Sequence, residues 1–158
     1  MVQVLVIIRK KEKACNNVYI LIIIYKDMDL EQIKYYEDKL KYEMDSADLW
    51  EALETEENVV AIDTRKPFAY KRQHIPTAIN MPHREMNETS TKDWDRSKLY
   101  VCYCDGIGCN GSTKGAYNLA KLGFNVKELI GGIEWWKFDG HATDGEESTP
   151  GKGVSCAC

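Results

Sequence analysis

The sequence predicts an α/β fold in which a doubly wound, mainly parallel sheet carries helices on both of its faces. Two short apolar runs, at residues 59–62 and 100–103, are typical of buried strands, and residues 126–130 are a further predicted strand. Segments with helical spacing or clear helix start and stop signals alternate with these runs along the chain. Strands and helices that alternate in this way form parallel sheets, because each crossover uses a helix. Ligands of such sheets bind beyond the carboxyl ends of the strands.

The elements before the central strand follow from local signals. A Ser that follows an acidic residue favours a helix start, a continuous apolar run favours a strand buried on both faces, and Pro favours a first helical turn. In chain order, these elements are a charged helix over 29–43, a helix that begins at Asp45-Ser46, the strand 59–62 that ends at Asp63, a short helix from Pro67 to Arg72, and a short strand over 75–79 beside a turn.

The second half of the predicted sheet begins at the central strand. Glycines mark the ends of its elements, because glycine is the usual residue just after a helix and in tight turns. The elements are the central strand 100–103, a helix over 112–122 capped by Gly123, a strand over 126–130, and a turn at Gly131-Gly132 into a last helix over 133–138.

A chain of 158 residues with 44% hydrophobic residues favours one domain with a sizeable core and short extensions. We expect a helical lead-in at 28–43, the domain itself at 44–141, and a flexible tail at 142–158 that ends in Cys156-Ala-Cys158. Residues 1–27 differ in character from the rest. Their two apolar runs are too short to span a bilayer, and no small-residue cleavage site follows them. Two interpretations are open for them. They form a hairpin, or translation starts at Met28 and residues 1–27 are upstream sequence read in frame.

Charge and cysteine content narrow the classes of partner. Residues 1–27 carry a net charge of +3, whereas the rest of the chain carries −7, which argues against nucleic acid as a partner. No membrane partner is expected either. The six cysteines are clustered, and the chain is too rich in core residues to need a disulfide scaffold. The clustering favours reactive thiols in a reducing compartment, the cytoplasm.

The most informative stretch is 99–116, in which a strand, a glycine-rich loop and a helix start follow one another. The strand delivers Cys104 to the carboxyl edge of the sheet, and the loop can fold its backbone N–H groups around the sulfur. The positive end of the helix dipole adds to these donors, and such surroundings lower a thiol's pKa and make it a nucleophile. We expect Gly106, Gly108 and Gly111 to supply the permissive φ angles that the loop needs.

Three stretches in order resemble the signatures of a known family. They are Asp63-Thr-Arg65-Lys-Pro67-Phe-Ala-Tyr70 followed by His74-Ile-Pro-Thr-Ala-Ile-Asn80, then Tyr103-Cys104 with its loop and Ser112-Thr113, and finally Gly131-Gly132-Ile-Glu-Trp135-Trp136. Over 44–141 the chain resembles the rhodanese-like (sulfurtransferase) domain family. It departs from that family at Gln73 and Thr77, where glycine is usual. Its active loop is also longer, holds no Arg, and contains Cys109.

The resemblance implies a sulfurtransferase that works through a cysteine persulfide, with no cofactor and no metal. Cys104 is the implied nucleophile, and Cys109 is a second thiol or an alternative nucleophile. The sulfur donor is a small anion such as thiosulfate or a protein persulfide, and the acceptor is a thiol or cyanide. Around the thiols we expect substrate contacts from Asp105, Gly106, Ile107, Gly108, Asn110, Gly111, Ser112, Thr113, Lys114 and Arg65.

Other readings of the same residues stay open. A cysteine phosphatase needs an Arg that closes the loop, but Asn110 and Gly115 stand six residues after the two cysteines, which disfavours that chemistry. A non-catalytic binding module remains an alternative. So does a thiol-redox or metal carrier that uses Cys104, Cys109 and the two cysteines of the tail.

Several side chains have a structural interpretation. We expect Cys102 in the core, Asp63 and Arg65 as an ion pair or turn lock, Trp135 and Trp136 as core and rim, His74 bonded to a turn, and His83 and His141 at the surface. Two further outcomes are possible for Cys109: its sulfur meets that of Cys104 if their Cα atoms lie within about 7 Å, or it points into the helix packing.

Overall fold

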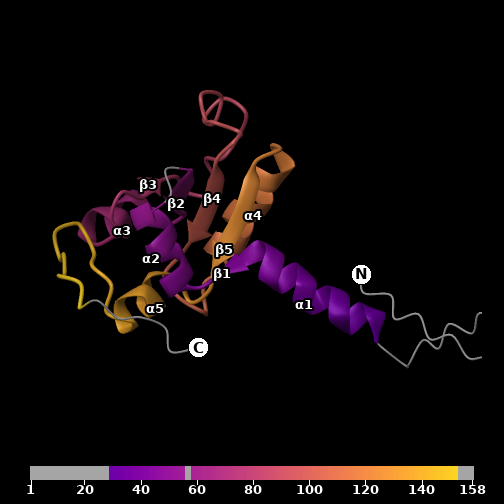
Figure 1. The fold of residues 1–158 in the computed structure, drawn as a ribbon. Helices are drawn as coiled ribbons and strands as arrows, with labels where there is room; N and C mark the ends of the chain where they lie inside the picture. Colours follow the sequence, from indigo (N-terminus) through magenta and orange to yellow (C-terminus); the bar gives the residue numbers. More distant parts are fainter. Residues whose placement is uncertain (1–28, 56–57, 153–158) are drawn as a thin grey trace, which may run out of the picture. The chain divides into compact units, whose positions relative to one another are not determined.

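The computed structural model describes residues 29–55 and 58–152, and its centre is a five-stranded sheet in which every neighbouring pair is parallel. The strand order is β1-β5-β4-β2-β3 (Figure 1). The strands are β1 (Glu43–Met44), β2 (Val59–Asp63), β3 (Ile79–Asn80), β4 (Leu99–Tyr103) and β5 (Asn125–Leu129). The predicted fold class is confirmed, and β4 is the central strand as predicted.

Helices cover both faces of this sheet because successive residues of a buried strand point to opposite sides. The helices are α1 (Leu30–Tyr42), α2 (Ser46–Thr55), α3 (Pro67–Arg72), α4 (Gly111–Lys121) and α5 (Gly132–Phe138). From β4, Val101 and Tyr103 join the core beneath α2 and α5, whereas Tyr100 and Cys102 join the core beneath α4 (Figure 1). The chain divides into two units within α1, after Tyr36, and the sheet belongs entirely to the second unit.

Helix ends follow the predicted local chemistry. The Asp45 carboxylate accepts the backbone N–H of Asp48 at 2.9 Å, which satisfies one free donor at the start of α2. Pro67 lies in the first turn of α3, and Gly123 follows α4 with a φ of +83°.

The predicted strand over 75–79 is shorter than expected. Only its last residue enters β3, because residues 75–78 form a turn instead. The Ala78 N–H donates to the Ile75 carbonyl at 3.1 Å, and Thr77 has a φ of +63°. The Tyr103 hydroxyl accepts the Ile75 N–H at 3.1 Å, so the turn is fastened to the central strand.

The chain after His141 differs from the flexible segment that we expected. His74 and Asp144 form an antiparallel bridge, and Thr143 pairs with Thr149. The Gln73 side-chain amide donates to the Thr143 hydroxyl at 2.9 Å, so residues 143–149 are tied to the end of α3. Residues 1–27 and the cysteines at 156 and 158 lie outside the described residues, where the predictions for them are not tested.

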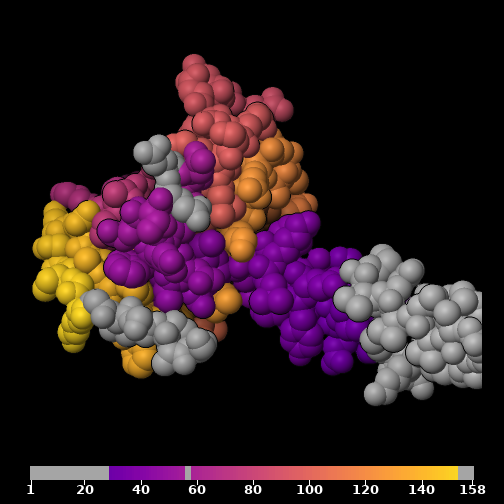
Figure 2. All heavy atoms as spheres, viewed as in Figure 1, coloured from indigo at the N-terminus to yellow at the C-terminus, as the bar shows by residue number. Residues whose placement is uncertain are grey.

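Two surface features complete the description. The segment 81–98, which links β3 to β4 through turns alone, projects at the top of Figure 2. Thr91, buried within it, donates its hydroxyl to the Asn87 carbonyl. Among the described residues, no helix combines the length and apolar character needed to cross a bilayer.

Candidate active site

The site lies at the carboxyl end of the central strand. Cys104 follows β4 directly, and Asp63 at the end of β2 pairs with Tyr103 in the adjacent register. The start of α5 fixes the backbone of the cysteine, because the N–H of Ile133 donates to the Cys104 carbonyl at 3.0 Å and that of Glu134 donates to Asp105 at 2.9 Å.

This close approach explains the Gly-Gly pair before α5. Gly131 and Gly132 have φ values of +75° and +58°, which side chains rarely adopt. A Cβ on Gly131 would collide with its neighbour Trp135, and one on Gly132 would collide with the Cys104 carbonyl oxygen. The last signature of the sequence therefore shapes the backbone of the cysteine loop.

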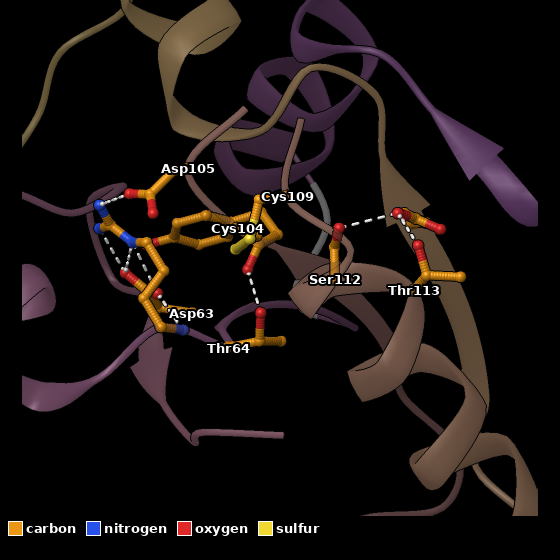
Figure 3. Close-up of a disulfide and its surroundings, with 10 residues drawn as sticks. Asp63, Thr64, Cys104, Asp105, Cys109, Ser112 and Thr113 are labelled. Carbon is orange, nitrogen blue, oxygen red and sulfur yellow. Dashed lines mark hydrogen bonds and ion pairs between the residues drawn. A yellow bond between two sulfur atoms is a disulfide. The ribbon is translucent and has the colours of Figure 1, made fainter. Parts of the chain in front are cut away.

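The two loop cysteines form a disulfide, with their Cα atoms 6.2 Å apart (Figure 3). We considered that the Cys109 sulfur either meets the Cys104 sulfur or points into the helix packing, and the structure shows the first of these. Cys104 is buried, with 4% of its surface exposed, whereas Cys109 is partly exposed. The start of α4 lies against the Cys104 Sγ, since a Cβ on Gly111 would stand 2.8 Å from that sulfur.

The role that we predicted for the loop glycines is wrong. None of Gly106, Gly108 and Gly111 has a positive φ. A Cβ on Gly106 would meet only the end of the exposed Glu134 side chain, which can move, whereas one on Gly111 would press on Cys104 and Thr64. Gly108 has open space around it. Packing, rather than backbone freedom, therefore requires glycine at Gly111.

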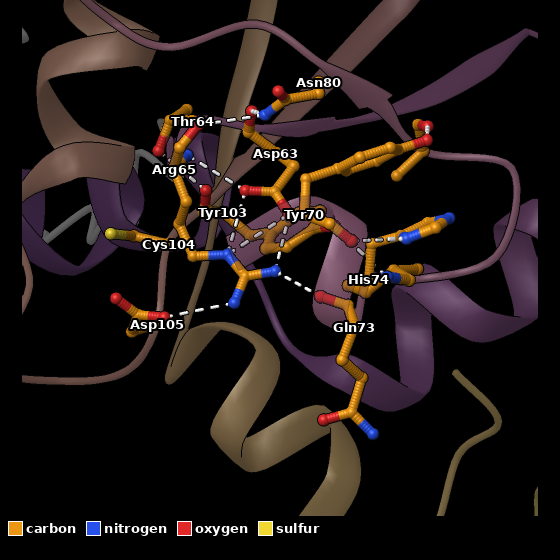
Figure 4. A network of polar contacts seen from close by, with 12 residues as sticks. Asp63, Thr64, Arg65, Tyr70, Gln73, His74, Asn80, Tyr103, Cys104 and Asp105 are labelled. Carbon is orange, nitrogen blue, oxygen red and sulfur yellow. Dashed lines mark hydrogen bonds and ion pairs between the residues drawn. The ribbon is translucent and has the colours of Figure 1, made fainter. Parts of the chain in front are cut away.

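Arg65 is the buried centre of a polar network beside the loop (Figure 4). Its guanidinium donates to the Asp63 carboxylate at 2.7 Å, to the Gln73 carbonyl at 2.6 Å, and to the Asp105 carboxylate at 3.1 Å. Burial opposes the charge, but the hydrogen bonds and attraction of Asp63, with a smaller contribution from Asp105, outweigh it and raise the pKa of Arg65 above its usual value. The predicted Asp63–Arg65 ion pair is confirmed, and it extends to the cysteine loop.

A cavity of about 470 Å³ opens beside the disulfide, and Cys109 is the cysteine that lines it. The charged side chains of its lining are Lys39, Glu43 and Glu128. Its other lining residues are Gly106, Ile107, Gly108, Asn110, Ser112, Thr113, Leu129, Ile130, Gly131 and Gly132.

The predicted contact residues divide into two groups at this cavity. Those from 106 to 108, with Asn110, Ser112 and Thr113, line it, whereas Arg65, Asp105, Gly111 and Lys114 do not. Lys114 also lies near His83: burial lowers the pKa of the partly buried His83, and the charges of Lys114 and Arg84 lower it further.

Glu128 is a site residue that our sequence reasoning missed. Its carboxylate accepts the Ser112 hydroxyl at 2.7 Å and the Thr113 hydroxyl at 2.8 Å, so β5 is linked to the first turn of α4. The sequence offers little signal for it, because Glu128 follows Lys127 in the predicted strand 126–130 and charged residues are ordinary on an exposed strand face.

Cys102 lies in the core as predicted. It has no exposed surface, and burial, with the nearby Glu128 carboxylate, raises the pKa of its thiol.

The cysteine loop also contains a group of potential metal ligands. The ligand atoms of Cys104, Asp105 and Cys109 all lie within 4.8 Å of one another. Among the described residues, these three ligands are one short of a closed zinc site, and disulfide sulfurs are not thiolates.

The histidine predictions have mixed outcomes. His74 is structural as predicted, because its Nδ1 pairs with the Tyr70 carbonyl at 2.8 Å and its ring stacks on that of Tyr70. The surface position predicted for His141 is wrong. It is 4% exposed, and its ring packs on those of Trp50 and Trp136.

The positions predicted for the two tryptophans of the last signature are wrong. Trp136 lies in the core with 2% of its surface exposed, whereas Trp135 is 40% exposed at the surface.

Comparison with known proteins identifies the family to which the chain belongs. The model of the "Rhodanese-like domain" family matches residues 45–139, more than half of the chain. The chain belongs to this family. This chain is similar to the thiosulfate sulfurtransferase GlpE of Coxiella burnetii. The two are 36% identical over 90 residues, which cover 56% of this chain and 79% of GlpE. This chain is also 31% identical over 74 residues, 46% of its length, to PspE of Escherichia coli, a thiosulfate sulfurtransferase, covering 69% of that protein.

Solved structures agree with this assignment. The crystal structure of the BH2092 protein from Bacillus halodurans matches with a TM-score of 0.71 and 44% identity, over 75% of this chain and 87% of that one. A rhodanese-related protein from Thermoplasma volcanium matches with a TM-score of 0.57 and 29% identity, over 65% and 97% of the two chains. The doubly wound sheet of this rhodanese-like domain is thus the one its relatives have.

Proposed function

We propose that this rhodanese-like domain is a sulfurtransferase that carries sulfane sulfur as a persulfide on Cys104. The observation that carries the proposal is the position of that sulfur, directly after the central strand and against the start of α4. The positive end of a helix dipole and the free N–H groups of its first turn stabilise a thiolate and an anionic terminal sulfur. The relatives named thiosulfate sulfurtransferases support the same chemistry.

The proposed reaction has two steps, and it starts from the reduced loop. The Cys104 thiolate attacks the outer sulfur of thiosulfate, the sulfur–sulfur bond of thiosulfate breaks, and sulfite leaves with the electron pair. The enzyme then holds the Cys104 persulfide anion. An acceptor thiolate or cyanide attacks the outer sulfur, and the Cys104 thiolate leaves, which gives an acceptor persulfide or thiocyanate.

The charges at the cavity bear on the choice of donor. Two carboxylates, of Glu43 and Glu128, and one ammonium, of Lys39, line it. This balance is unfavourable for a doubly charged anion such as thiosulfate and less so for the persulfide of a thiol, which carries one charge at its sulfur. We therefore propose persulfides, alkyl or protein-borne, as donors beside thiosulfate. Reduced thiols fit a cytoplasmic location.

The test is thiocyanate formation by the reduced protein from thiosulfate and cyanide. Cys104→Ser is expected to abolish it, because an alcohol is a far weaker nucleophile and cannot carry a persulfide. Cys109→Ser is expected to retain part of it. Cys102→Ala, which removes a buried thiol, is the matched control and is expected to stay active.

Two results would contradict the proposal. Full activity in Cys104→Ser with loss in Cys109→Ser would move the persulfide to Cys109. If the wild type released no sulfite from thiosulfate and formed neither thiocyanate nor a persulfide from thiosulfate or from an alkyl persulfide, the binding-module reading would hold instead.

A further inference from the structure

We propose that Cys109 resolves the Cys104 persulfide, so that the domain reduces thiosulfate to sulfite and hydrosulfide at the expense of a dithiol. This activity rests on the proposed function of Cys104, and it adds a second product and a redox partner to it.

The geometry of the loop carries the inference. Cys104 and Cys109 are joined by a disulfide while β4, α4 and α5 hold the positions described above. The Cys109 N–H donates to the Gly106 carbonyl at 3.0 Å, so a turn within the loop brings the second cysteine back over the first. The attacking and attacked sulfurs therefore meet without any rearrangement of the sheet or its helices.

The two sulfurs also differ in access. Cys104 is buried beneath the loop, whereas Cys109 is partly exposed and lines the cavity. A sulfur bound outside Cys104 thus lies near the second thiol, and a small product has an open route into the cavity.

The proposed step balances as follows. The deprotonated Cys109 thiol attacks the inner sulfur, the Sγ of Cys104. The bond between the inner and outer sulfur breaks, and the outer sulfur leaves with the electron pair and takes up a proton as hydrosulfide. The persulfide sulfur is reduced, the two cysteines are oxidised to the disulfide, and no other oxidant is needed.

A dithiol closes the cycle. Its thiolate attacks the Cys109 sulfur, which is the accessible one, and Cys104 leaves as a thiolate stabilised at the start of α4. The second thiol of the reductant then attacks the mixed disulfide, releasing the Cys109 thiol and an oxidised dithiol. In sum, thiosulfate and one dithiol give sulfite, hydrosulfide and one disulfide.

The test is a single turnover without reductant, in the full chain carrying Cys102→Ala. Trypsin then releases residues 99–114 as one peptide whose only cysteines are the two of the loop. After reduction, removal of the reductant and addition of thiosulfate, we expect sulfite and hydrosulfide in equal amounts. The peptide should lose the mass of two hydrogens, and dithiothreitol should restore it.

The matched variant adds Cys109→Ser to this background. Sulfite is expected to appear without hydrosulfide, and the peptide should gain the mass of one sulfur atom instead of losing two hydrogens. Because the other cysteines of the chain are present in both proteins, the difference between them belongs to Cys109. Circular dichroism of both variants checks that they are folded.

Separate results would overturn the inference and the function on which it rests. A stable extra sulfur on the peptide in the Cys102→Ala protein, with Cys109 still free, would overturn the resolving role while the transferase function stands. An extra sulfur found on Cys109 would show attack on the outer sulfur and a relay, which also overturns it. Absence of sulfite from both proteins would overturn the transferase function and this inference together.

Discussion

Arg65 is the residue that connects the first signature to the cysteine loop. Its guanidinium is almost fully buried, and two carboxylates and a backbone carbonyl surround it. Removing one member of a buried pair leaves a charge that neither water nor a partner stabilises. Arg65 therefore matters for the stability of the site as well as for its charge.

We expect Arg65→Met to lower the free energy of unfolding by about 3 kcal/mol, because Asp63 would remain buried without its partner. The control is Lys71→Met, since Lys71 forms an exposed ion pair with Glu146 and exposed pairs are worth less than about 1 kcal/mol. Urea unfolding measures both variants. Equal losses in the two variants would show that the Arg65 network does not stabilise the fold.

Single side chains were predicted best where the partner is near in sequence. The Asp63–Arg65 pair is two residues apart and was predicted, whereas the contact of Arg65 with Asp105 spans 40 residues and was not. The loop glycines show the same limit: their number suggested backbone freedom, but the atoms that restrict a Cβ at Gly111 include the Thr64 hydroxyl, 47 residues away in the sequence.

The elements themselves were predictable because their signals are local. The helix expected over 112–122 is α4 at Gly111–Lys121, and the strand expected over 126–130 is β5 at Asn125–Leu129. The strand expected over 75–79 failed because apolar residues at 75, 78 and 79 suit a turn packed on the core as well as a strand. Pattern alone does not distinguish the two.

The start of α5 is the element that most directly shapes the site, and two glycine variants test it. Gly132→Ala is expected to lower the free energy of unfolding by at least about 2 kcal/mol, since it combines a positive φ with a collision against backbone. Gly123→Ala, also at positive φ, would meet only the end of the long Arg96 side chain rather than backbone, and is expected to cost about 1 kcal/mol. Thermal unfolding compares them, and an equal or larger loss in Gly123→Ala would contradict this account.

At the scale of the whole molecule, the last described segment closes the core that α2 and α5 share. His141 packs on Trp50 of α2 and Trp136 of α5, and residues 143–149 then run to the end of α3. We predicted flexibility for this segment from its polar composition. Composition does not show that Gln73 is buried and that its side-chain amide needs hydrogen-bond partners, which this segment supplies. Long-range satisfaction of polar groups was the part of the fold that sequence could not supply.

The buried His141 makes the stability of the molecule depend on pH. Burial lowers the pKa of His141 from 6.5, although the charge of Asp139 opposes this, and its Nε2 has no hydrogen-bond partner among the described residues. The unfolded chain therefore binds a proton near pH 6.5 that the folded chain takes up only at lower pH. Stability is fully present above that pH and is lost as pH falls toward the pKa of the folded state.

We expect His141→Phe to reduce this loss, because a phenyl ring can pack between the same two tryptophans and does not titrate. The measurement is urea unfolding at pH 7.5 and at pH 5.5, and one proton contributes at most about 1.4 kcal/mol per pH unit. Some loss remains in the variant, since burial lowers the pKa of His83 as well. If the variant lost as much stability as the wild type between the two pH values, His141 would not be the group that couples protonation to folding.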